Sequence, residues 1–149
     1  RPLAIPAMPN VHSHAFQRAL RGRTQRGGGS FWTWREDMYA LARTMTPDRC
    51  FELAKGTYAE MRRAGITTVG EFDYLHFSDA LIAAADAVGI RLTLLDACYL
   101  AGGFGEPPNE AQRAFSDGDA AAWAAPACRP RSRRPRSSTS GSRARWSRC

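Results

Sequence analysis

The chain has 149 residues, 44% of them hydrophobic, which is enough for the core of one ordinary domain. Its net charge of +7 comes from the C-terminal part, because residues 1–119 carry a net charge of −1 whereas residues 120–149 contain eight arginines and no acidic residue. No apolar run is long enough to span a bilayer and no Cys-x-x-Cys spacing occurs, which argues against a membrane protein or a disulfide-rich secreted domain and favours a cytoplasmic protein.

The chain alternates between strand and helix patterns. It opens without a methionine and almost directly in a strand, so we expect further residues before Arg1 in the parent protein. The predicted elements are a strand at Leu3–Val11, a loop at Gln17–Gly29, a helix at Phe31–Arg43 capped by Ser30, a helix at Thr46–Ala64, a strand at Ile66–Phe72, a helix at Asp79–Val88 and a strand at Ile90–Tyr99. Glycines at the helix ends and this order are typical of a parallel α/β sheet.

The order fits the first three strands of a (β/α)8 barrel, although an open flavodoxin-like sheet would place its loops similarly. Polar residues follow three predicted strands, namely the pair His12 and His14, the segment Glu71–His76 and the segment Asp96–Tyr99. In such barrels the catalytic groups gather at the C-terminal ends of the strands. The sequence therefore predicts one functional face that is formed by all three strand ends.

His12 and His14 form a His-x-His pair at the end of the first predicted strand. Alternate side chains of an extended segment lie on the same face, so the two imidazoles point in one direction. A catalytic zinc ion uses about three protein ligands and one open position. The pair therefore indicates half of a metal site, and the alternative is a polar strand end with two unrelated histidines.

Four stretches resemble a known group of enzymes: HSHAFQRA at His12–Ala19, SFWTWRE at Ser30–Glu36, EFDYLH at Glu71–His76 and AGGFG at Ala101–Gly105. They resemble the amidohydrolase superfamily and, within it, the formimidoylglutamate deiminases of histidine degradation. The resemblance extends to about Phe115. It implies a TIM-type (β/α)8 barrel, of which this chain holds about the first three β/α units.

The resemblance also implies the site. His12 and His14 would bind zinc, and Gln17, Arg35 and Tyr74 would bind N-formimino-L-glutamate, which is converted to N-formyl-L-glutamate and ammonia. The family's other metal ligands and its acid/base group lie beyond residue 115, so we expect an incomplete zinc site, no catalytic acid/base residue and an inactive, truncated chain. The full-length relative is expected to be a homo-oligomer.

Other residues are assigned on chemistry or on departures from the family. Asp73 stands where relatives are expected to have a histidine, and the loop after His76 is shorter than is usual in the family. His76 is expected to be a hydrogen-bonded structural residue, and Trp32 and Trp34 to be pocket wall and core. Cys50 and Cys98 fall in apolar patterns, and we expect both to be buried, reduced thiols.

We divide the chain into a partial barrel at residues 1–119 and a low-complexity Arg/Ser/Pro tail at residues 120–149, which we expect to be disordered from Pro126 onward. The tail has the composition of a GC-rich gene read out of frame, and we prefer this interpretation to a basic arm that binds phosphates. Two rival functions remain: a deaminase of guanine or cytosine rings, and a nucleic-acid-binding fragment. Arg35 and the Trp-Thr-Trp block argue against the first, and the lack of interleaved aromatic residues in the tail argues against the second.

Overall fold

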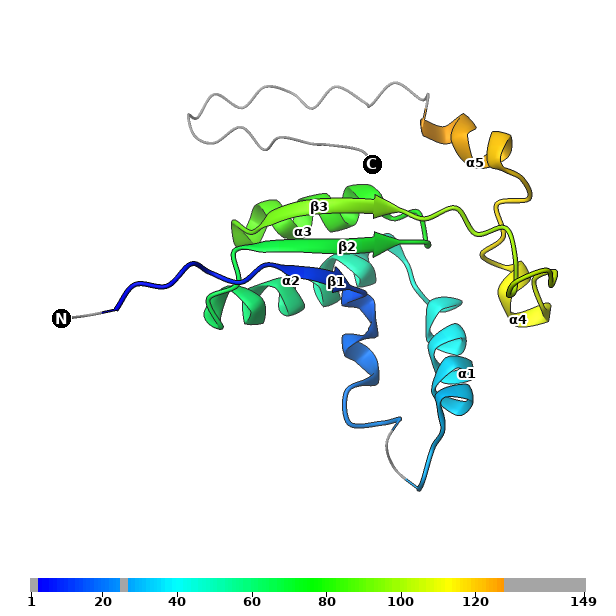
Figure 1. The fold of residues 1–149 in the computed structure, drawn as a ribbon, viewed down its shortest axis with the longest axis horizontal. Helices are drawn as coiled ribbons and strands as arrows, with labels where there is room; N and C mark the ends of the chain where they lie inside the picture. The colour runs from blue at the N-terminus through cyan, green and yellow to red at the C-terminus, as the bar shows by residue number, and fades with distance from the viewer. Residues whose placement is uncertain (1–2, 25–26, 128–149) are drawn as a thin grey trace. The chain divides into compact units, whose positions relative to one another are not determined.

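A parallel sheet of three strands forms the centre of the N-terminal part of the chain (Figure 1). The structure, a computed structural model, describes residues 3–24 and 27–127. These residues belong to two units, with the boundary between Ala97 and Cys98.

The strands of the first unit are β1 (Asn10–Ser13), β2 (Thr68–Asp73) and β3 (Arg91–Asp96), in the order β1-β2-β3. Each strand is parallel to its neighbour, and β2 pairs with β3 in regular register from Thr68 opposite Arg91 to Asp73 opposite Asp96. Between the strands run α1 (Phe31–Ala42), α2 (Pro47–Arg63) and α3 (Ser78–Val88). The predicted order of strands and helices is therefore confirmed, and the sheet of the described residues is not closed into a barrel.

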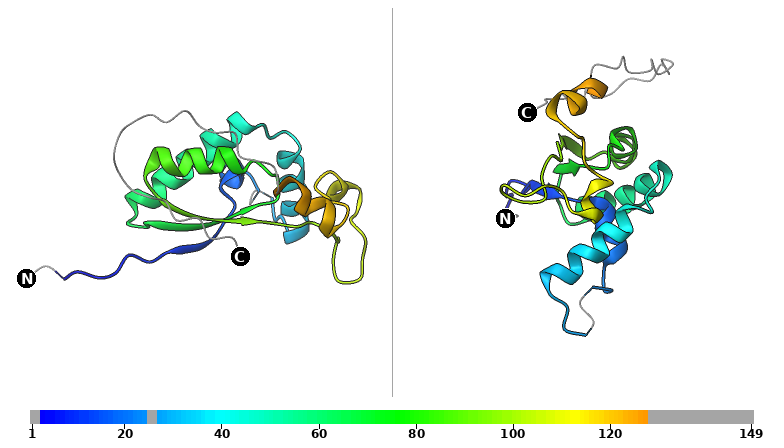
Figure 2. Two further views of the ribbon diagram at one scale, coloured as in Figure 1. Left: turned by 90° about the horizontal axis from the view of Figure 1, so that it is seen from above. Right: turned by 90° about the vertical axis from the view of Figure 1, so that its right-hand side faces the viewer.

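Helices α2 and α3 cover one face of the sheet (Figures 1 and 2). The core between the layers consists of small and apolar side chains that include Ala54, Tyr58, Val69, Leu81, Ala84 and Ala85. Leu92 and Leu94 of β3 pack against this core from the sheet. The alanines allow the two helices to lie close to the strands, while Tyr58 fills the remaining volume.

The helix ends follow the signals in the sequence. The Thr46 side chain accepts a hydrogen bond from the Arg49 amide at the start of α2, and Pro47 occupies the first helical position. Gly89 ends α3 in the left-handed conformation, with φ of 72°. Ser30 and Thr33 form a reciprocal capping box at the start of α1. These three predicted ends are confirmed.

Three predictions about the first unit are wrong. Residues Leu3–Pro9 are not part of a strand, because Pro6 and Pro9 cannot donate to a ladder and the strand begins only at Asn10. The predicted loop at Gln17–Gly29 begins inside the 3-10 helix η1 (Ala15–Leu20). Trp32 is not a core residue, because 64% of it is exposed.

The two cysteines differ in their surroundings. Cys50 lies in the core, where burial raises the pKa of its thiol to about 12. A thiol with so high a pKa is a poor nucleophile. Cys98 was also expected to be buried but is exposed, because it lies after the end of β3.

The second unit contains the short helix α4 (Glu110–Arg113) and the helix α5 (Ala120–Ala127). Gln112 is its buried centre, with side-chain hydrogen bonds to the Asn109 amide, the Tyr99 hydroxyl and the Gly102 carbonyl. The start of the predicted tail, where residues 120–125 are almost all alanine, forms α5, since alanine has the highest helix propensity. Disorder was predicted only from Pro126 onward, and this prediction is wrong for Pro126 and Ala127, which end α5. The rest of the predicted tail, residues 128–149, lies outside the described residues.

Among the described residues, no helix has both the length and the apolar character needed to cross a bilayer.

Candidate metal and substrate site

The His-x-His pair lies at the end of β1, with His12 in an irregular stretch of the strand and His14 directly after it. Asn10 pairs with Val69 and Ser13 pairs with Glu71, so β1 contains one residue more than the matching part of β2. Such a β-bulge bends a strand and redirects its side chains. Ser13 is buried opposite Glu71, while the rings of His12 and His14 lie 4.7 and 5.4 Å from the ring of Phe72.

Gly70 allows β1 to lie close to β2 at this bulge. A Cβ atom built on Gly70 would lie only 2.8 Å from the Val11 carbonyl oxygen and 3.2 Å from the Val11 carbonyl carbon. Both atoms belong to the main chain of β1, which cannot turn away as a flexible side chain can. A glycine is therefore required at this position by the close approach of the two strands.

The two histidines present nitrogen atoms to the same point. The Nε2 atoms of His12 and His14 are 3.1 Å apart. Two nitrogen ligands that bind one tetrahedral ion at about 2.0 to 2.1 Å lie about 3.3 Å apart, so the observed pair fits two neighbouring ligand positions of one metal ion. Burial, and secondarily the neighbouring His12, lowers the pKa of His14. The lower pKa favours the neutral imidazole that metals require.

The pair is not a complete ligand set. Within residues 3–24 and 27–127, no group of three or more His, Cys, Asp or Glu side chains is placed to hold a metal ion. The buried Nδ1 atom of His14 also has no hydrogen-bond partner among these residues, although the second nitrogen of a metal-binding histidine usually donates to one. The orientation of His14 is therefore set by its ring contacts and by its main chain.

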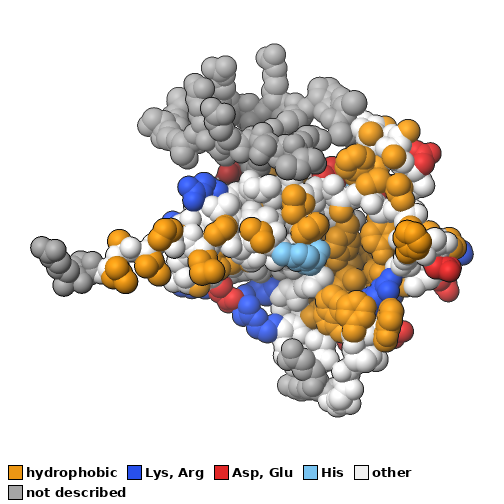
Figure 3. All heavy atoms as spheres, viewed as in Figure 1, with side chains coloured by type: hydrophobic (Ala, Val, Ile, Leu, Met, Phe, Trp, Pro, Cys, Tyr) orange, Lys and Arg blue, Asp and Glu red, His pale blue; other side chains and the backbone are white. Residues whose placement is uncertain are grey.

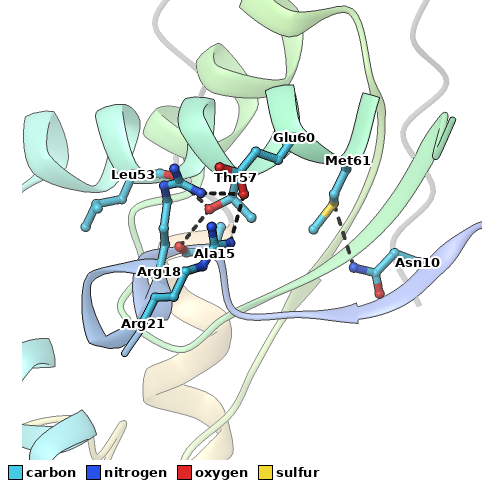
Figure 4. Close-up of polar contacts among 8 residues, drawn as sticks. All are labelled: Asn10, Ala15, Arg18, Arg21, Leu53, Thr57, Glu60 and Met61. Carbon is cyan, nitrogen blue, oxygen red and sulfur yellow. Dashed lines mark hydrogen bonds and ion pairs between the residues drawn. The ribbon is translucent and has the colours of Figure 1, made fainter. Parts of the chain in front are cut away.

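The main chain after His14 is held on α2, as Figure 4 shows. Thr57 donates a hydrogen bond from its hydroxyl to the Ala15 carbonyl at 3.2 Å. Arg18 and Arg21 of η1 both contact the Glu60 carboxylate, at 2.6 and 2.8 Å. Their hydrogen bonds lower the pKa of Glu60 to about 2. Helix η1 thus begins at the residue that follows His14, and contacts with α2 hold both of its ends.

Two carboxylates of β2 are buried on the face that the helices cover. Glu71 is 1% exposed, and its Oε1 atom accepts a hydrogen bond of 2.6 Å from the Ala15 amide. Asp73 is 2% exposed and accepts hydrogen bonds from the Phe77 amide and the Ser78 hydroxyl, at 3.1 and 2.7 Å. Burial raises the pKa of both carboxyl groups. Asp73, which departs from the expected family residue, thus closes the turn that leads into α3.

Tyr74 lies directly beside the histidine pair. Its ring centroid is 5.6 Å from that of His14 and 5.7 Å from that of Phe16. Its hydroxyl donates a hydrogen bond of 3.1 Å to the sulfur of Met38 in α1. Tyr74 therefore connects the end of β2 with both the end of β1 and the helix α1.

Arg35 lies on α1, one turn before Met38. Its Nε donates to the Tyr39 hydroxyl at 3.0 Å, and its guanidinium carbon lies 5.7 Å from the Trp32 ring centroid and 5.4 Å from that of Tyr39. Stacking on aromatic faces holds a guanidinium in a defined plane. Arg35 therefore lies on the same helix as Met38, whose sulfur accepts the hydrogen bond from Tyr74.

Gln17 and His76 complete the set of residues singled out in the sequence. Gln17 lies on η1, and its main-chain amide donates a hydrogen bond to the His14 carbonyl at 3.0 Å. The Nδ1 atom of His76 is 3.4 Å from the Asp96 carboxylate, which joins the ends of β2 and β3. His76 has a positive φ of 57°, which is strained for a residue other than glycine. The structure thus brings His12, His14 and Tyr74 together directly, and relates Gln17 to them through the main chain.

The sheet face that the helices leave uncovered has both polar and apolar side chains on its surface (Figures 1 and 3). In the view of Figure 3, pale blue histidine side chains lie in the centre of the face and are bordered by orange hydrophobic side chains. Apolar residues that are more than half exposed include Ile5, Met8, Val11, Phe31 and Trp32.

One residue in the site was not identified as functional from the sequence. Glu71 was predicted only as part of the segment Glu71–His76 at the functional face, with no role of its own, yet its carboxylate holds the main chain next to His14. The available signal was a charged residue in the middle of the apolar strand Thr68–Asp73, because a buried charge requires hydrogen-bond partners.

A parallel α/β sheet that carries a His-x-His pair at the end of its first strand is the arrangement of the amidohydrolase family. Residues 3–135 match this family, and the chain belongs to it. The match runs beyond Phe115, where the resemblance of the motifs ends.

The comparisons also give particular relatives. The chain is 42% identical over 134 residues to a formimidoylglutamate deiminase of Pseudomonas aeruginosa, in an alignment that covers 78% of this chain and 30% of the relative. An amidohydrolase from Brucella melitensis has a TM-score of 0.68 and 43% identity, covering 74% of this chain and 28% of that one. A mutant of the atrazine chlorohydrolase TrzN from Arthrobacter aurescens, complexed with zinc and atraton, has a TM-score of 0.58 and 26% identity over 68% of this chain and 25% of that one. The chain therefore spans less than a third of the length of these proteins.

Proposed function

We propose that this chain is the N-terminal part of a metal-dependent hydrolase that acts on N-formimino-L-glutamate. Water would be added to the formimino carbon and the imino nitrogen released as ammonia, leaving N-formyl-L-glutamate. The observation that carries the proposal is the pair of Nε2 atoms 3.1 Å apart beside Tyr74. The identity of 42% to a formimidoylglutamate deiminase supports the choice of substrate.

His12 and His14 would hold zinc together with ligands from the part of the relatives that this chain does not cover. Zinc supplies Lewis acidity, which makes water nucleophilic near neutral pH. The presence of zinc in the atrazine chlorohydrolase structure supports this choice of metal. The lowered pKa of His14 favours the same arrangement, because protons do not compete for its nitrogen near neutral pH.

Arg35, Tyr74 and Gln17 would bind the substrate. Formiminoglutamate carries two carboxylates, and a guanidinium binds a carboxylate through two parallel hydrogen bonds. The plane of the Arg35 guanidinium is set by Tyr39 and Trp32, so the side chain is already oriented before substrate arrives. Tyr74 would provide a hydroxyl donor close to the histidines, and Gln17 an amide donor from η1.

The proposal includes that the chain by itself is inactive. Residues 1–119 would form a partial barrel with two of the zinc ligands, and residues 120–149 would take no part in the chemistry. A small molecule is the proposed partner, in preference to nucleic acid. A cytoplasmic location and homo-oligomers of the full-length enzyme belong to the same proposal.

A chimera tests the proposal. Residues 3–115 of this chain would replace the matching segment of the Pseudomonas aeruginosa deiminase, and ammonia release would be measured with zinc and N-formimino-L-glutamate, guanine or cytosine. We expect turnover of N-formimino-L-glutamate only, loss of turnover in the variant His12→Ala, and a raised KM in Arg35→Lys. The isolated chain is the control and should release no ammonia.

Three results would contradict the proposal. Turnover by the isolated chain at an enzymatic rate would overturn the claim that it is inactive. A chimera that acts on guanine or cytosine instead would overturn the substrate. Full activity of the His12→Ala chimera would overturn the metal site.

A further inference from the structure

Glu71 has an unusual place in the molecule. It is a carboxylate in the middle of a buried strand, 1% exposed, on the sheet face opposite to the histidines. Such a group requires compensation for the loss of water. One compensating contact is clear, because the Oε1 atom accepts the hydrogen bond of 2.6 Å from the Ala15 amide.

This contact acts on the residue next to His14. The Ala15 amide belongs to the peptide group that His14 begins, so the carboxylate fixes one end of that peptide plane. Two further hydrogen bonds hold the same stretch, from the Gln17 amide to the His14 carbonyl at 3.0 Å and from the Thr57 hydroxyl to the Ala15 carbonyl at 3.2 Å. The main chain on the C-terminal side of His14 is thus held by β2, by α2 and by η1.

The His14 ring has one polar contact, between its Nε2 atom and the Nε2 atom of His12 at 3.1 Å. Its Nδ1 atom is buried without a partner among the described residues, and its other contacts are with the rings of His12, Phe72 and Tyr74. In most metal sites a hydrogen bond to the second ring nitrogen orients the ligand. At His14 the orientation comes instead from the ring contacts and from the backbone conformation, to which the Ala15 contact contributes.

The bulge in β1 makes this control necessary. Because β1 carries one extra residue between Asn10 and Ser13, the regular ladder does not define the path of the main chain at His12 and His14. Ser13 is again paired, opposite Glu71, and the Glu71 carboxylate accepts a hydrogen bond from the Ala15 amide, two residues beyond the end of β1. Glu71 therefore lies where the chain leaves the sheet and turns into η1.

We propose that Glu71 is a positioning residue for the metal site: its carboxylate fixes the main chain at Ala15 and so holds the Nε2 atom of His14 beside that of His12. The inference rests on the proposed function, because the histidine pair is taken as a pair of metal ligands. Glu71 touches neither the metal nor the substrate in this assignment.

Three variants separate the positioning role from general stability. Glu71→Gln keeps an acceptor oxygen at the same reach, whereas Glu71→Met has a similar volume and no acceptor. Asp73→Asn is the matched control, since Asp73 is an equally buried carboxylate of the same strand whose hydrogen bonds go to the turn before α3. Circular dichroism selects the variants that fold, and Glu71→Asp, which retains the charge but is too short to reach Ala15, replaces Glu71→Met if that variant does not fold.

The first measurement uses the metal-free chain. Nuclear Overhauser contacts between the rings of His14 and Tyr74 report the position of His14 without any metal. We expect these contacts in the unchanged chain, Glu71→Gln and Asp73→Asn, and their loss in Glu71→Met. Retention of the contacts in a folded Glu71→Met variant would overturn the inference whether or not the chain binds metal.

The second measurement is titration with cobalt(II), followed by its visible absorption. We expect Glu71→Met to bind about tenfold or more weakly, in the range typical of groups that orient a ligand, with Glu71→Gln and Asp73→Asn unchanged. This titration uses the metal-free chimera with the Pseudomonas aeruginosa deiminase, which carries the remaining ligands. Equal affinity of the Glu71→Met chimera and the unchanged chimera would overturn the inference and leave the metal site in place. Absence of binding by the unchanged chimera, or equal binding by its His12→Ala variant, would instead overturn the proposed metal site.

Discussion

Replacement of Gly70 by alanine tests whether the close approach of β1 to β2 is needed for the site. The added Cβ atom would lie 2.8 Å from the Val11 carbonyl oxygen, whereas ordinary contacts of a Cβ atom begin at 3.4 Å. The obstacle is main chain, so β1 would have to move by the difference of about 0.6 Å. Overpacking of this kind costs about 1 to 3 kcal/mol of the free energy of unfolding.

The matched control is Gly103→Ala. No atom lies within 4 Å of a Cβ atom built on Gly103, and its φ is not in the region that favours glycine. We expect this variant to change the free energy of unfolding by less than about 0.5 kcal/mol. Both variants keep the net charge and differ from the parent by one methyl group, so the comparison isolates the contact with β1.

Urea denaturation followed by circular dichroism measures the effect. We expect Gly70→Ala to lower the urea midpoint without changing the slope, because the surface exposed on unfolding stays nearly the same. The histidine pair should be displaced together with β1, so cobalt(II) should bind more weakly to the folded variant. A Gly70→Ala chain with the stability and the cobalt affinity of the Gly103→Ala chain would refute the argument that the glycine is required for strand approach.

Two further predictions concern pH and the core. The pKa of His14 is lowered in the folded chain, so the unfolded chain binds more protons below about pH 6.5 and this residue makes the protein less stable as pH falls. The free energy of unfolding, measured with urea, should therefore fall less between pH 8 and pH 5.5 in His14→Gln than in the parent chain. If it falls equally in both chains over that range, the lowered pKa is contradicted. Leu81 is 3% exposed, so Leu81→Ala should lower the free energy of unfolding by about 2 to 5 kcal/mol, whereas Leu3→Ala, at a residue 89% exposed, should leave the urea midpoint in place.

Local signals in the sequence were sufficient for most of the helices. Thr46 and Pro47 mark the start of α2, and Gly89 marks the end of α3, as predicted. These features depend on a few neighbouring residues and on φ values that only certain side chains allow, so they can be read without knowledge of the fold. The period-two argument likewise placed His12 and His14 on one face, and the structure confirms this placement beside Phe72.

The errors occur where tertiary contacts decide the conformation. Helix η1 was predicted as a loop because the sequence after Gln17 is rich in arginine and glycine. In the structure Arg18 and Arg21 are held by Glu60, which lies 39 residues beyond Arg21 in the chain. A single sequence does not show which acidic residue such arginines meet. Trp32 was assigned to pocket wall and core from its size, but it lies on the exposed side of α1.

The sequence by itself determined the order of strands and helices, the helix ends, and the presence of two histidines on one face of a strand. Those properties follow from backbone conformation and from the alternation of side chains, which act over a few residues. Only the tertiary structure decided that β1 bulges past Gly70, and that Glu71 reaches across from β2 to the amide beside His14. Such contacts join residues more than fifty positions apart, and they exist only when packing brings the two strands and α2 together.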